Sequence, residues 1–147
     1  MSEHYKVRIA KDTLVFCAGH FITYEGDKCE RLHGHNYRAA VEVEGGLDNN
    51  HYVFDFIVLK QRARAITEEL DHRMLLPTRN PFVTLEEGLR SVRVRYRDRE
   101  WAFPRDDCVL LPVENTTAEL LARYIGQRLL ADLRSHHGYE PKVLRVE

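Results

Sequence analysis

Three histidines in the first quarter of the chain have a spacing that suits a metal site. His33 and His35 are two residues apart in the segment CERLHGHNY, residues 29–37, and side chains i and i+2 of a strand point to the same face. His20 ends an earlier strand-like segment, and pairing of the two strands would bring its imidazole beside the others. Three imidazoles with one open coordination position are typical of catalytic zinc. The sequence therefore predicts a Zn²⁺ site made of His20, His33 and His35.

Cys29 is separated from His33 by three residues, and its position allows two roles. A thiolate is a good zinc ligand, so Cys29 could close the site as a fourth, structural ligand. A cation beside it would also lower the pKa of the thiol and make it reactive. Structural sites with one cysteine and three histidines are rarer than open sites with three histidines, so we favour a reactive thiol. The remaining alternative is that His33 and His35 are ordinary exposed strand residues.

The segment LDHRMLL, residues 70–76, carries an adjacent acid and histidine, Asp71 and His72. A carboxylate that holds an imidazole makes the ring a better proton shuttle. The alternative is a helix C-terminus that is stabilised by a histidine near the negative end of its dipole. The spacing alone favours this second interpretation.

The segment ENTTAE, residues 114–119, also has two interpretations. A hydroxyl or amide residue followed by a glutamate is typical of a helix N-terminal capping arrangement. The same threonine hydroxyls, together with Glu119, could form a polar corner that recognises a ligand. Glu147 is the last residue, and taken alone it indicates only a solvated terminus.

Composition places the chain among ordinary globular proteins. It has 147 residues, of which 44% are hydrophobic and 31% charged, which suits one domain over residues 1–147. The net charge of −1 gives no electrostatic reason to expect nucleic acid or a membrane surface as partner. There is no apolar run near the roughly 18 residues of a membrane span and no signal-peptide pattern, so we expect a cytoplasmic protein. Three widely spaced cysteines argue against a disulfide framework.

Alternation of apolar and polar residues predicts the strands. The predicted strands cover residues 5–20, 35–44, 91–103 (as a hairpin), 109–113 and 142–147. Residues 77–90 contain two prolines and a glycine and are predicted as a loop with one helical turn around residues 84–89.

Two segments have helical periodicity. Asp55 is the predicted N-cap of the first helix, which should end near Leu70 or Asp71. Its predicted buried stripe is Ile57, Val58, Leu59, Ile66 and Leu70. Asn115 or Thr116 should cap the second helix, and Gly138 should close it. Its predicted stripe is Leu120, Leu121, Tyr124, Ile125, Leu129 and Leu130. Strand pairs with two helices predict an α+β fold, an antiparallel sheet with both helices on one face. Its open edge strands suggest contact with another subunit.

Taken together, these segments resemble the 6-pyruvoyltetrahydropterin synthase / 6-carboxytetrahydropterin synthase family. The matching segments are FCAGHF (16–21), CERLHGHNY (29–37), FDFIVLK (54–60), LDHRMLL (70–76), NTTAELLARYI (115–125) and the terminal VLRVE. The resemblance implies the T-fold, or tunnelling fold, in which three subunits close a β-barrel. Two such trimers would stack into a homohexamer with active sites between subunits.

The resemblance also implies roles for single residues. It assigns zinc to the three histidines and makes Cys29 the general base. Asp71 and His72 would complete a proton relay. The residues that would hold the pterin ring are Thr117, Glu119 and Glu147.

The implied substrate is 7,8-dihydroneopterin triphosphate. The short spacing between Cys29 and His33 resembles the branch that forms 6-carboxy-5,6,7,8-tetrahydropterin, acetaldehyde and triphosphate on the path to queuosine. The alternative within the family is a 6-pyruvoyltetrahydropterin synthase, which eliminates triphosphate only. Alternatives of other kinds are a non-catalytic zinc or pterin-binding module, and another T-fold pterin enzyme such as an aldolase on dihydroneopterin, which would lack the zinc histidines.

Overall fold

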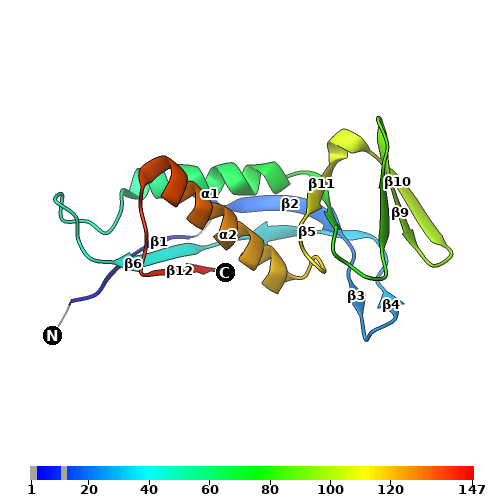
Figure 1. Ribbon diagram of the computed structural model, residues 1–147, viewed down its shortest axis with the longest axis horizontal. Helices are drawn as coiled ribbons and strands as arrows, with labels where there is room; N and C mark the ends of the chain where they lie inside the picture. The colour runs from blue at the N-terminus through cyan, green and yellow to red at the C-terminus, as the bar shows by residue number, and fades with distance from the viewer. Residues whose placement is uncertain (1–2, 11–12) are drawn as a thin grey trace. The chain divides into compact units, whose positions relative to one another are not determined.

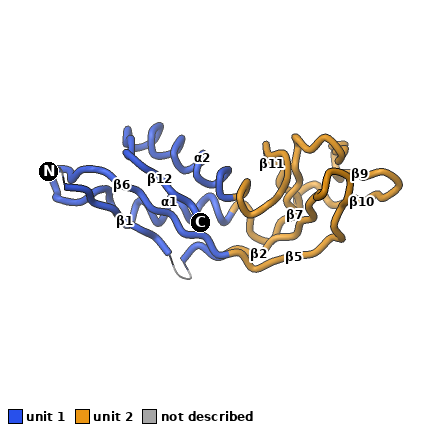
Figure 2. The backbone as a smooth tube through the Cα atoms, turned by 90° about the horizontal axis from the view of Figure 1, so that it is seen from below, with its two compact units in different colours: residues 1–15, 38–68, 122–147 blue, residues 16–37, 69–121 orange. Residues whose placement is uncertain are grey.

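The structure is a computed structural model that describes residues 3–10 and 13–147. It contains two compact units, and each collects segments that lie far apart in the sequence (Figure 2). Unit 1 comprises residues 1–15, 38–68 and 122–147, and unit 2 comprises residues 16–37 and 69–121. The single domain over residues 1–147 stays a prediction. Among the described residues, no helix is long and apolar enough to cross a membrane.

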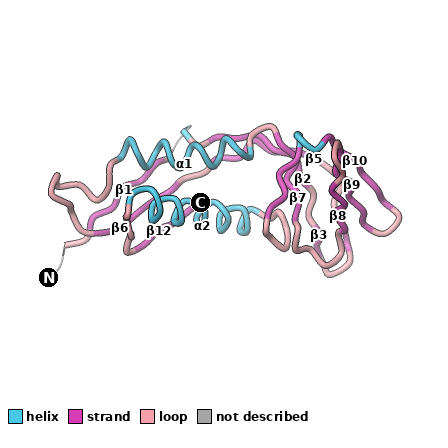
Figure 3. The backbone as a smooth tube through the Cα atoms, turned by 45° about the horizontal axis from the view of Figure 1, so that its top comes forward, coloured by secondary structure: helices cyan, strands magenta, loops and turns pink. Residues whose placement is uncertain are grey.

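Unit 1 contains a three-stranded antiparallel sheet covered by helices. The strand order is β1 (Tyr5–Ile9), β6 (Val41–Gly45) and β12 (Val143–Val146). Figures 1 and 3 show α1 (Phe56–Leu70) and α2 (Ala118–His137), and Figure 1 shows them on the same side of this sheet. Gly126 allows the close approach of α2 to β12, because a Cβ there would lie 3.3 Å from Val146. The predicted α+β arrangement is confirmed.

The first helix begins where its cap predicts. The Asp55 carboxylate accepts the backbone N–H groups of Ile57 and Val58 at 2.9 and 3.1 Å, two donors that have no partner inside the helix. The buried face consists of Leu59, Ala63, Ile66, Thr67 and Leu70. Ile57 is 65% exposed, so its predicted place in the buried stripe is wrong. It precedes Leu59 by two residues, about 200° around the helix, and therefore points away from the buried face.

The second helix is capped by a different residue from those predicted. The hydroxyl of Thr117 accepts the N–H of Leu120 at 3.3 Å, so the cap is Thr117 and neither Asn115 nor Thr116. The C-terminus agrees with the prediction, because Gly138 has a φ of 57° and its N–H donates to Arg134. This left-handed residue satisfies the last carbonyls of the helix. The buried positions of its stripe are Leu121, Tyr124, Ile125, Leu129 and Leu133, so Leu133 belongs to the stripe although it was not predicted, and the predicted Leu120 and Leu130 are only partly buried.

Unit 2 contains two larger sheets and one small one. The first has the order β11 (Cys108–Leu111), β7 (Arg73–Pro77), β2 (Val15–His20) and β5 (His33–Arg38). The second is antiparallel and consists of β8 (Thr84–Glu87), β9 (Ser91–Tyr96) and β10 (Arg99–Pro104). The short strands β3 (Thr23–Tyr24) and β4 (Lys28–Cys29) pair with each other, and a 3₁₀ turn covers Arg105–Asp107. Pairing of β7 with β2 and with β11 is parallel.

Three sequence predictions differ from this arrangement. The predicted strand over residues 5–20 is two strands, β1 and β2, and its Lys11 and Asp12 lie outside the described residues. The predicted strand over residues 35–44 is likewise divided into β5 and β6. The helical turn predicted around residues 84–89 is wrong, because Thr84–Glu87 pairs with β9. Pairing with β9 gives this backbone its hydrogen bonds, and a local pattern does not reveal that partner.

An apolar cluster joins the second sheet of unit 2 to β7. Its buried members are Phe21, Met74, Leu76, Val83, Val92, Val94, Tyr96 and Cys108. We expect Leu76→Ala to lower the free energy of unfolding by about 2–5 kcal/mol, because the truncation leaves a cavity in a packed interior. The matched control is Leu89→Ala at a side chain that is 95% exposed, with a change within about 0.5 kcal/mol. Denaturant titration measures both, and equal effects would contradict this account of the core.

Candidate metal centre

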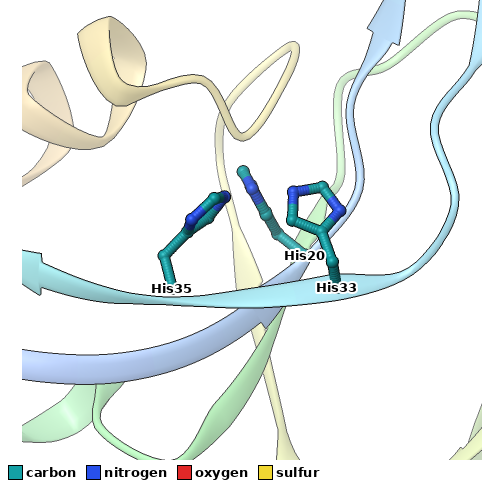
Figure 4. Close-up of side chains that lie close together, drawn as sticks. All are labelled: His20, His33 and His35. Atoms are coloured by element: carbon teal, nitrogen blue, oxygen red, sulfur yellow. The ribbon is translucent and has the colours of Figure 1, made fainter.

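The three predicted histidines lie together at the junction of β2 and β5. His20 is the last residue of β2, and His33 and His35 lie at the start of the neighbouring strand β5. One ring nitrogen of each lies within 4.8 Å of one in each of the others. Figure 4 shows His33 and His35 on the same face of their strand, with the His20 ring between them. The convergence expected from the strand spacing is therefore present in the structure.

Backbone carbonyls determine which ring nitrogen carries the hydrogen in two of these imidazoles. His20 Nδ1 lies 2.9 Å from the carbonyl of Thr116, and His33 Nδ1 lies 2.7 Å from that of Arg31. A carbonyl only accepts, so each Nδ1 carries a hydrogen, and in the neutral tautomer this leaves the lone pair on Nε2. Carbonyls that orient imidazoles in this way are common behind metal ligands.

His20 supplies an independent test of whether the site fits a cation. It is 6% exposed, and its Nε2 is buried without a hydrogen-bond partner among the described residues. Burial lowers the pKa of His20, so the ring is neutral near pH 7. A buried acceptor without a partner costs free energy, and a metal ion would remove that cost. The three histidines could therefore hold a metal ion, and imidazole ligands suit zinc, copper, iron and nickel.

The wall beside the histidines includes Tyr37, a residue that the sequence analysis did not single out. Its ring stacks on Phe16 with centroids 4.9 Å apart and lies edge-on to His35 at 5.5 Å. Burial raises the pKa of Tyr37 to about 12, so the phenol stays protonated. Its hydroxyl is buried and has no hydrogen-bond partner among the described residues. The period of two from His33 through His35 to Tyr37 is the signal that could have identified it.

Cys29 lies on β4, half-buried against the apolar cluster. Among the described residues, the group of side chains whose ligand atoms converge contains only the three histidines. Cys29 does not belong to this group. Its thiol donates to the carbonyl of Glu30 at 3.4 Å. Burial raises the pKa of the Cys29 thiol, the Arg99 guanidinium lowers it, and the Glu30 carboxylate raises it again.

Glu30 is a second residue that the sequence analysis missed. Its Oε1 lies 4.0 Å from Nε2 of His33 and also accepts the N–H of Ile22 at 3.0 Å. A carboxylate is thus fixed beside the ring nitrogen that faces the metal centre. The signal in the sequence is a glutamate adjacent to Cys29 and three residues before a candidate ligand.

Asp71 and His72 form the predicted pair directly after α1. Asp71 Oδ1 lies 3.0 Å from Nδ1 of His72 and accepts the N–H of Cys17 at 2.9 Å. His72 has a φ of 57°, a left-handed conformation that does not continue α1, which ends at Leu70. The bond from Cys17, followed by the one from His72, lowers the pKa of Asp71. The His72 side chain is 81% exposed, so it is free to meet a group outside this chain.

The start of α2 is attached to the metal centre. Thr116 is fully buried, its carbonyl accepts from His20, and its hydroxyl donates to the carbonyl of Phe21 at 3.2 Å. Thr117 follows as the cap, and Glu119 lies exposed in the first helical turn. These residues therefore lie next to His20, one of the three candidate ligands, and their role as a polar recognition corner stays a prediction.

Glu147 belongs to unit 1. Its carboxylate accepts from Arg8 at 3.1 Å, and its backbone pairs with that of Ala40 through two hydrogen bonds of 2.9 Å. Hydrogen bonds thus fix Glu147 just beyond β12. A pterin-binding role for Glu147 stays a prediction.

Comparison with known proteins gives one family model that matches nearly the whole chain and relatives that match parts of it. A family model described as 6-pyruvoyl tetrahydropterin synthase matches residues 9–147. A Pyrococcus horikoshii protein, provisionally named 6-carboxy-5,6,7,8-tetrahydropterin synthase, is 33% identical over 130 residues, which is 84% of this chain and 74% of that protein. The dihydroneopterin monophosphate aldolase of Pyrococcus furiosus is 42% identical over 60 residues, 41% of this chain and 50% of that one.

A solved structure shows the same fold. The 6-pyruvoyltetrahydropterin synthase of Plasmodium vivax, in a variant whose catalytic glutamate is replaced by alanine, superposes with a TM-score of 0.88. The two sequences are 27% identical, and the match covers 99% of this chain and 90% of that one.

Proposed function

The chain belongs to the 6-pyruvoyl tetrahydropterin synthase family, a family of lyases, and has its T-fold; on this premise we propose that it is a zinc-dependent lyase. The proposed substrates are 7,8-dihydroneopterin triphosphate and one water molecule, and the proposed products are 6-carboxy-5,6,7,8-tetrahydropterin, acetaldehyde and triphosphate, on the path to queuosine. The observation that carries the metal part of this proposal is the buried, unpartnered Nε2 of His20 beside His33 and His35. The spacing between Cys29 and His33 favours the carboxy-forming branch over the pyruvoyl-forming one.

Each residue of the centre has a defined task in this proposal. Zinc held by His20, His33 and His35 would supply a Lewis acid that makes protons next to the substrate hydroxyls easier to remove. Cys29, as the thiolate, would accept one such proton: its sulfur lies outside the ligand group, and although burial raises the pKa of the thiol, the positive Arg99 acts against that increase. Tyr37 remains a neutral hydrogen-bond donor on the wall of the site.

His72 moves a second proton, held in orientation by Asp71. Its exposed ring suits an active site that is completed by another subunit. The edge strands β1 and β12 of the sheet in unit 1 offer backbone groups for pairing with further chains. We therefore include in the proposal a homohexamer, two trimers that each close a barrel, with active sites between subunits.

Thr117, Glu119 and Glu147 are the proposed pterin-binding residues. A carboxylate can accept both the 2-amino group and the ring N–H of a pterin, and these charge-assisted bonds fix the ring relative to the metal. We expect Glu119→Gln to lower kcat/KM by about 10–100-fold, since a bond to a charged group contributes about 1.5–3 kcal/mol. Steady-state kinetics check this, with unchanged metal content and Glu68→Gln on α1 as the control. An unaltered kcat/KM would remove Glu119 from the site.

Metal removal tests the proposed function directly. Protein dialysed against a chelator should lose turnover and regain it when one equivalent of Zn²⁺ per chain is added. Elemental analysis of the untreated protein should show bound zinc. A metal-loaded protein that binds pterin without turning it over would instead be the non-catalytic module.

Glu30 favours a second candidate, an aldol-type cleavage of a phosphorylated dihydroneopterin side chain. One support is that the Glu30 carboxylate lies 4.0 Å from Nε2 of His33. Two others are the similarity to a dihydroneopterin monophosphate aldolase and the glutamate that is called catalytic in the Plasmodium vivax protein. In this candidate Glu30 is the base and Cys29 is dispensable. Product analysis of Cys29→Ala and Glu30→Gln separates the two: the first candidate requires the thiol, and the second requires the carboxylate.

A further inference from the structure

The hairpin formed by β9 and β10 contacts the segment that carries Cys29. We propose that Arg99, on this hairpin, is a positioning residue that fixes the Cys29 thiol and keeps a positive charge beside it. The inference rests on the proposed role of Cys29 as the general base. The groups involved all belong to unit 2.

The contacts of Arg99 are with the backbone that orients the thiol. Its Nη1 donates to the carbonyls of Cys29 and Glu30 at 3.1 and 3.3 Å. The Glu30 carbonyl is also the acceptor of the Cys29 thiol, at 3.4 Å. Arg99 therefore fixes the same oxygen atom that sets the direction of Sγ.

Arg99 is itself held by an aromatic stack. Its guanidinium lies 4.8 Å from the ring centroid of Trp101, and Trp101 stacks on Phe21 with centroids 4.6 Å apart at 17°. Phe21 is 2% exposed and directly follows His20 in the chain. Trp101 is partly buried against the apolar cluster, and a guanidinium stacked on a packed ring has restricted freedom, so the backbone that orients the thiol and the strand end that carries His20 are attached to the same cluster.

Two more contacts attach the hairpin to the turn before Cys29. The hydroxyl of Tyr96, whose ring is buried, donates to the carbonyl of Asp27. Arg97 lies 3.8 Å from the Asp27 carboxylate, although this pair is exposed and contributes little to stability. The segment from Asp27 to Glu30 pairs with β3, and its attachment to the β9–β10 hairpin is made mainly by Tyr96 and Arg99.

The charge of Arg99 acts in the direction that a base requires. The positive group lowers the pKa of the Cys29 thiol, against the larger effect of burial and the smaller effect of Glu30, which both raise it. Guanidinium remains protonated at all working pH values. Removal of Arg99 should therefore leave the orientation of the Cys29 side chain less restricted and raise the pKa of its thiol.

The test measures the reactivity of the Cys29 thiol independently of turnover. Metal-loaded wild type, Arg99→Met, Arg99→Lys and Arg95→Met are alkylated with iodoacetamide across a pH series, and modified Cys29 is quantified by peptide mass spectrometry. The exposed Cys17 is the internal reference, and Arg95, which faces Glu100 on the same hairpin, is the matched control site. The midpoint of the pH profile reports thiolate formation, and the plateau rate reports access.

For Arg99→Met we expect a higher midpoint at Cys29, an unchanged profile at Cys17 and unchanged metal content. We also expect kcat to fall about 10–100-fold with little change in KM, since general base catalysis contributes about 10²–10⁴-fold. Arg99→Lys keeps the positive charge but lacks the planar guanidinium that donates to two carbonyls. It should therefore bring the alkylation midpoint of Cys29 closer to the wild-type value than it brings kcat.

The proposal fails if the Cys29 midpoint and kcat of Arg99→Met match those of Arg95→Met. A wild-type protein without turnover would contradict the proposed function but leave the alkylation result decisive for Arg99. If Arg99→Met does not fold, Arg99→Lys is compared with Arg95→Met instead. A lower kcat for Arg99→Lys together with a near-normal alkylation midpoint at Cys29 supports the proposal. A kcat equal to that of Arg95→Met overturns it.

Discussion

Cys29→Ala is expected to lower kcat by about 10²–10⁴-fold, the usual contribution of a general base, while zinc content and fold stay unchanged. The thiol lies outside the group of ligand nitrogens, so its loss leaves the three imidazoles in place. Alanine keeps the backbone carbonyls that Arg99 holds. Kinetics, elemental analysis and thermal unfolding of the same preparation measure the three quantities together.

Cys17→Ala is the matched control for this substitution, because Cys17 is an exposed cysteine of β2. Its backbone, which the substitution preserves, makes the contacts with Asp71 and His72. If zinc leaves with the thiol of Cys29, that residue is a ligand and its role as base is wrong. If turnover persists while zinc stays, the proton acceptor is another group, and Glu30 is the first to test.

His33→Ala is expected to remove metal and activity together. Loss of a residue that only hydrogen-bonds to a metal ligand lowers metal affinity by about 10–100-fold. Because His33→Ala removes a proposed ligand itself, its metal affinity should fall by more than this. His33 is the suitable choice since its side chain is 35% exposed, whereas truncation of the buried His20 would also disturb packing. Metal titration with a competing chelator measures the affinity.

His136→Ala serves as the control, since His136 lies on α2 and pairs with Asp132. This variant should retain the metal affinity and turnover of the wild type. Full zinc occupancy of His33→Ala under chelator competition would show that the metal is held elsewhere.

The convergence of the three histidines could be predicted from sequence because its signals are local. His33 and His35 share a strand face by a period of two, and His20 ends the strand that pairs with theirs. Local chemistry also identified the caps at Asp55 and Gly138. Each of these features depends on residues close together in the chain or on neighbouring strands.

The parts that the sequence did not predict depend on long-range contacts. Thr84–Glu87 is a strand because β9 pairs with it, although its own composition indicated a loop with a helical turn. Arg99 reaches carbonyls about seventy positions earlier in the chain, and no periodicity indicates that pairing. Glu30 was not predicted because its carboxylate is fixed by the N–H of Ile22, eight positions earlier in the chain.

Product identification is the most direct test of the central claim that this chain is a zinc-dependent tetrahydropterin synthase of the carboxy-forming kind. Zinc-loaded protein is incubated with 7,8-dihydroneopterin triphosphate, and the pterin product and any aldehyde are identified by chromatography and mass spectrometry. We predict 6-carboxy-5,6,7,8-tetrahydropterin and acetaldehyde in equal amounts. A pyruvoyl product without acetaldehyde, or no turnover by protein with full zinc occupancy, would contradict the claim.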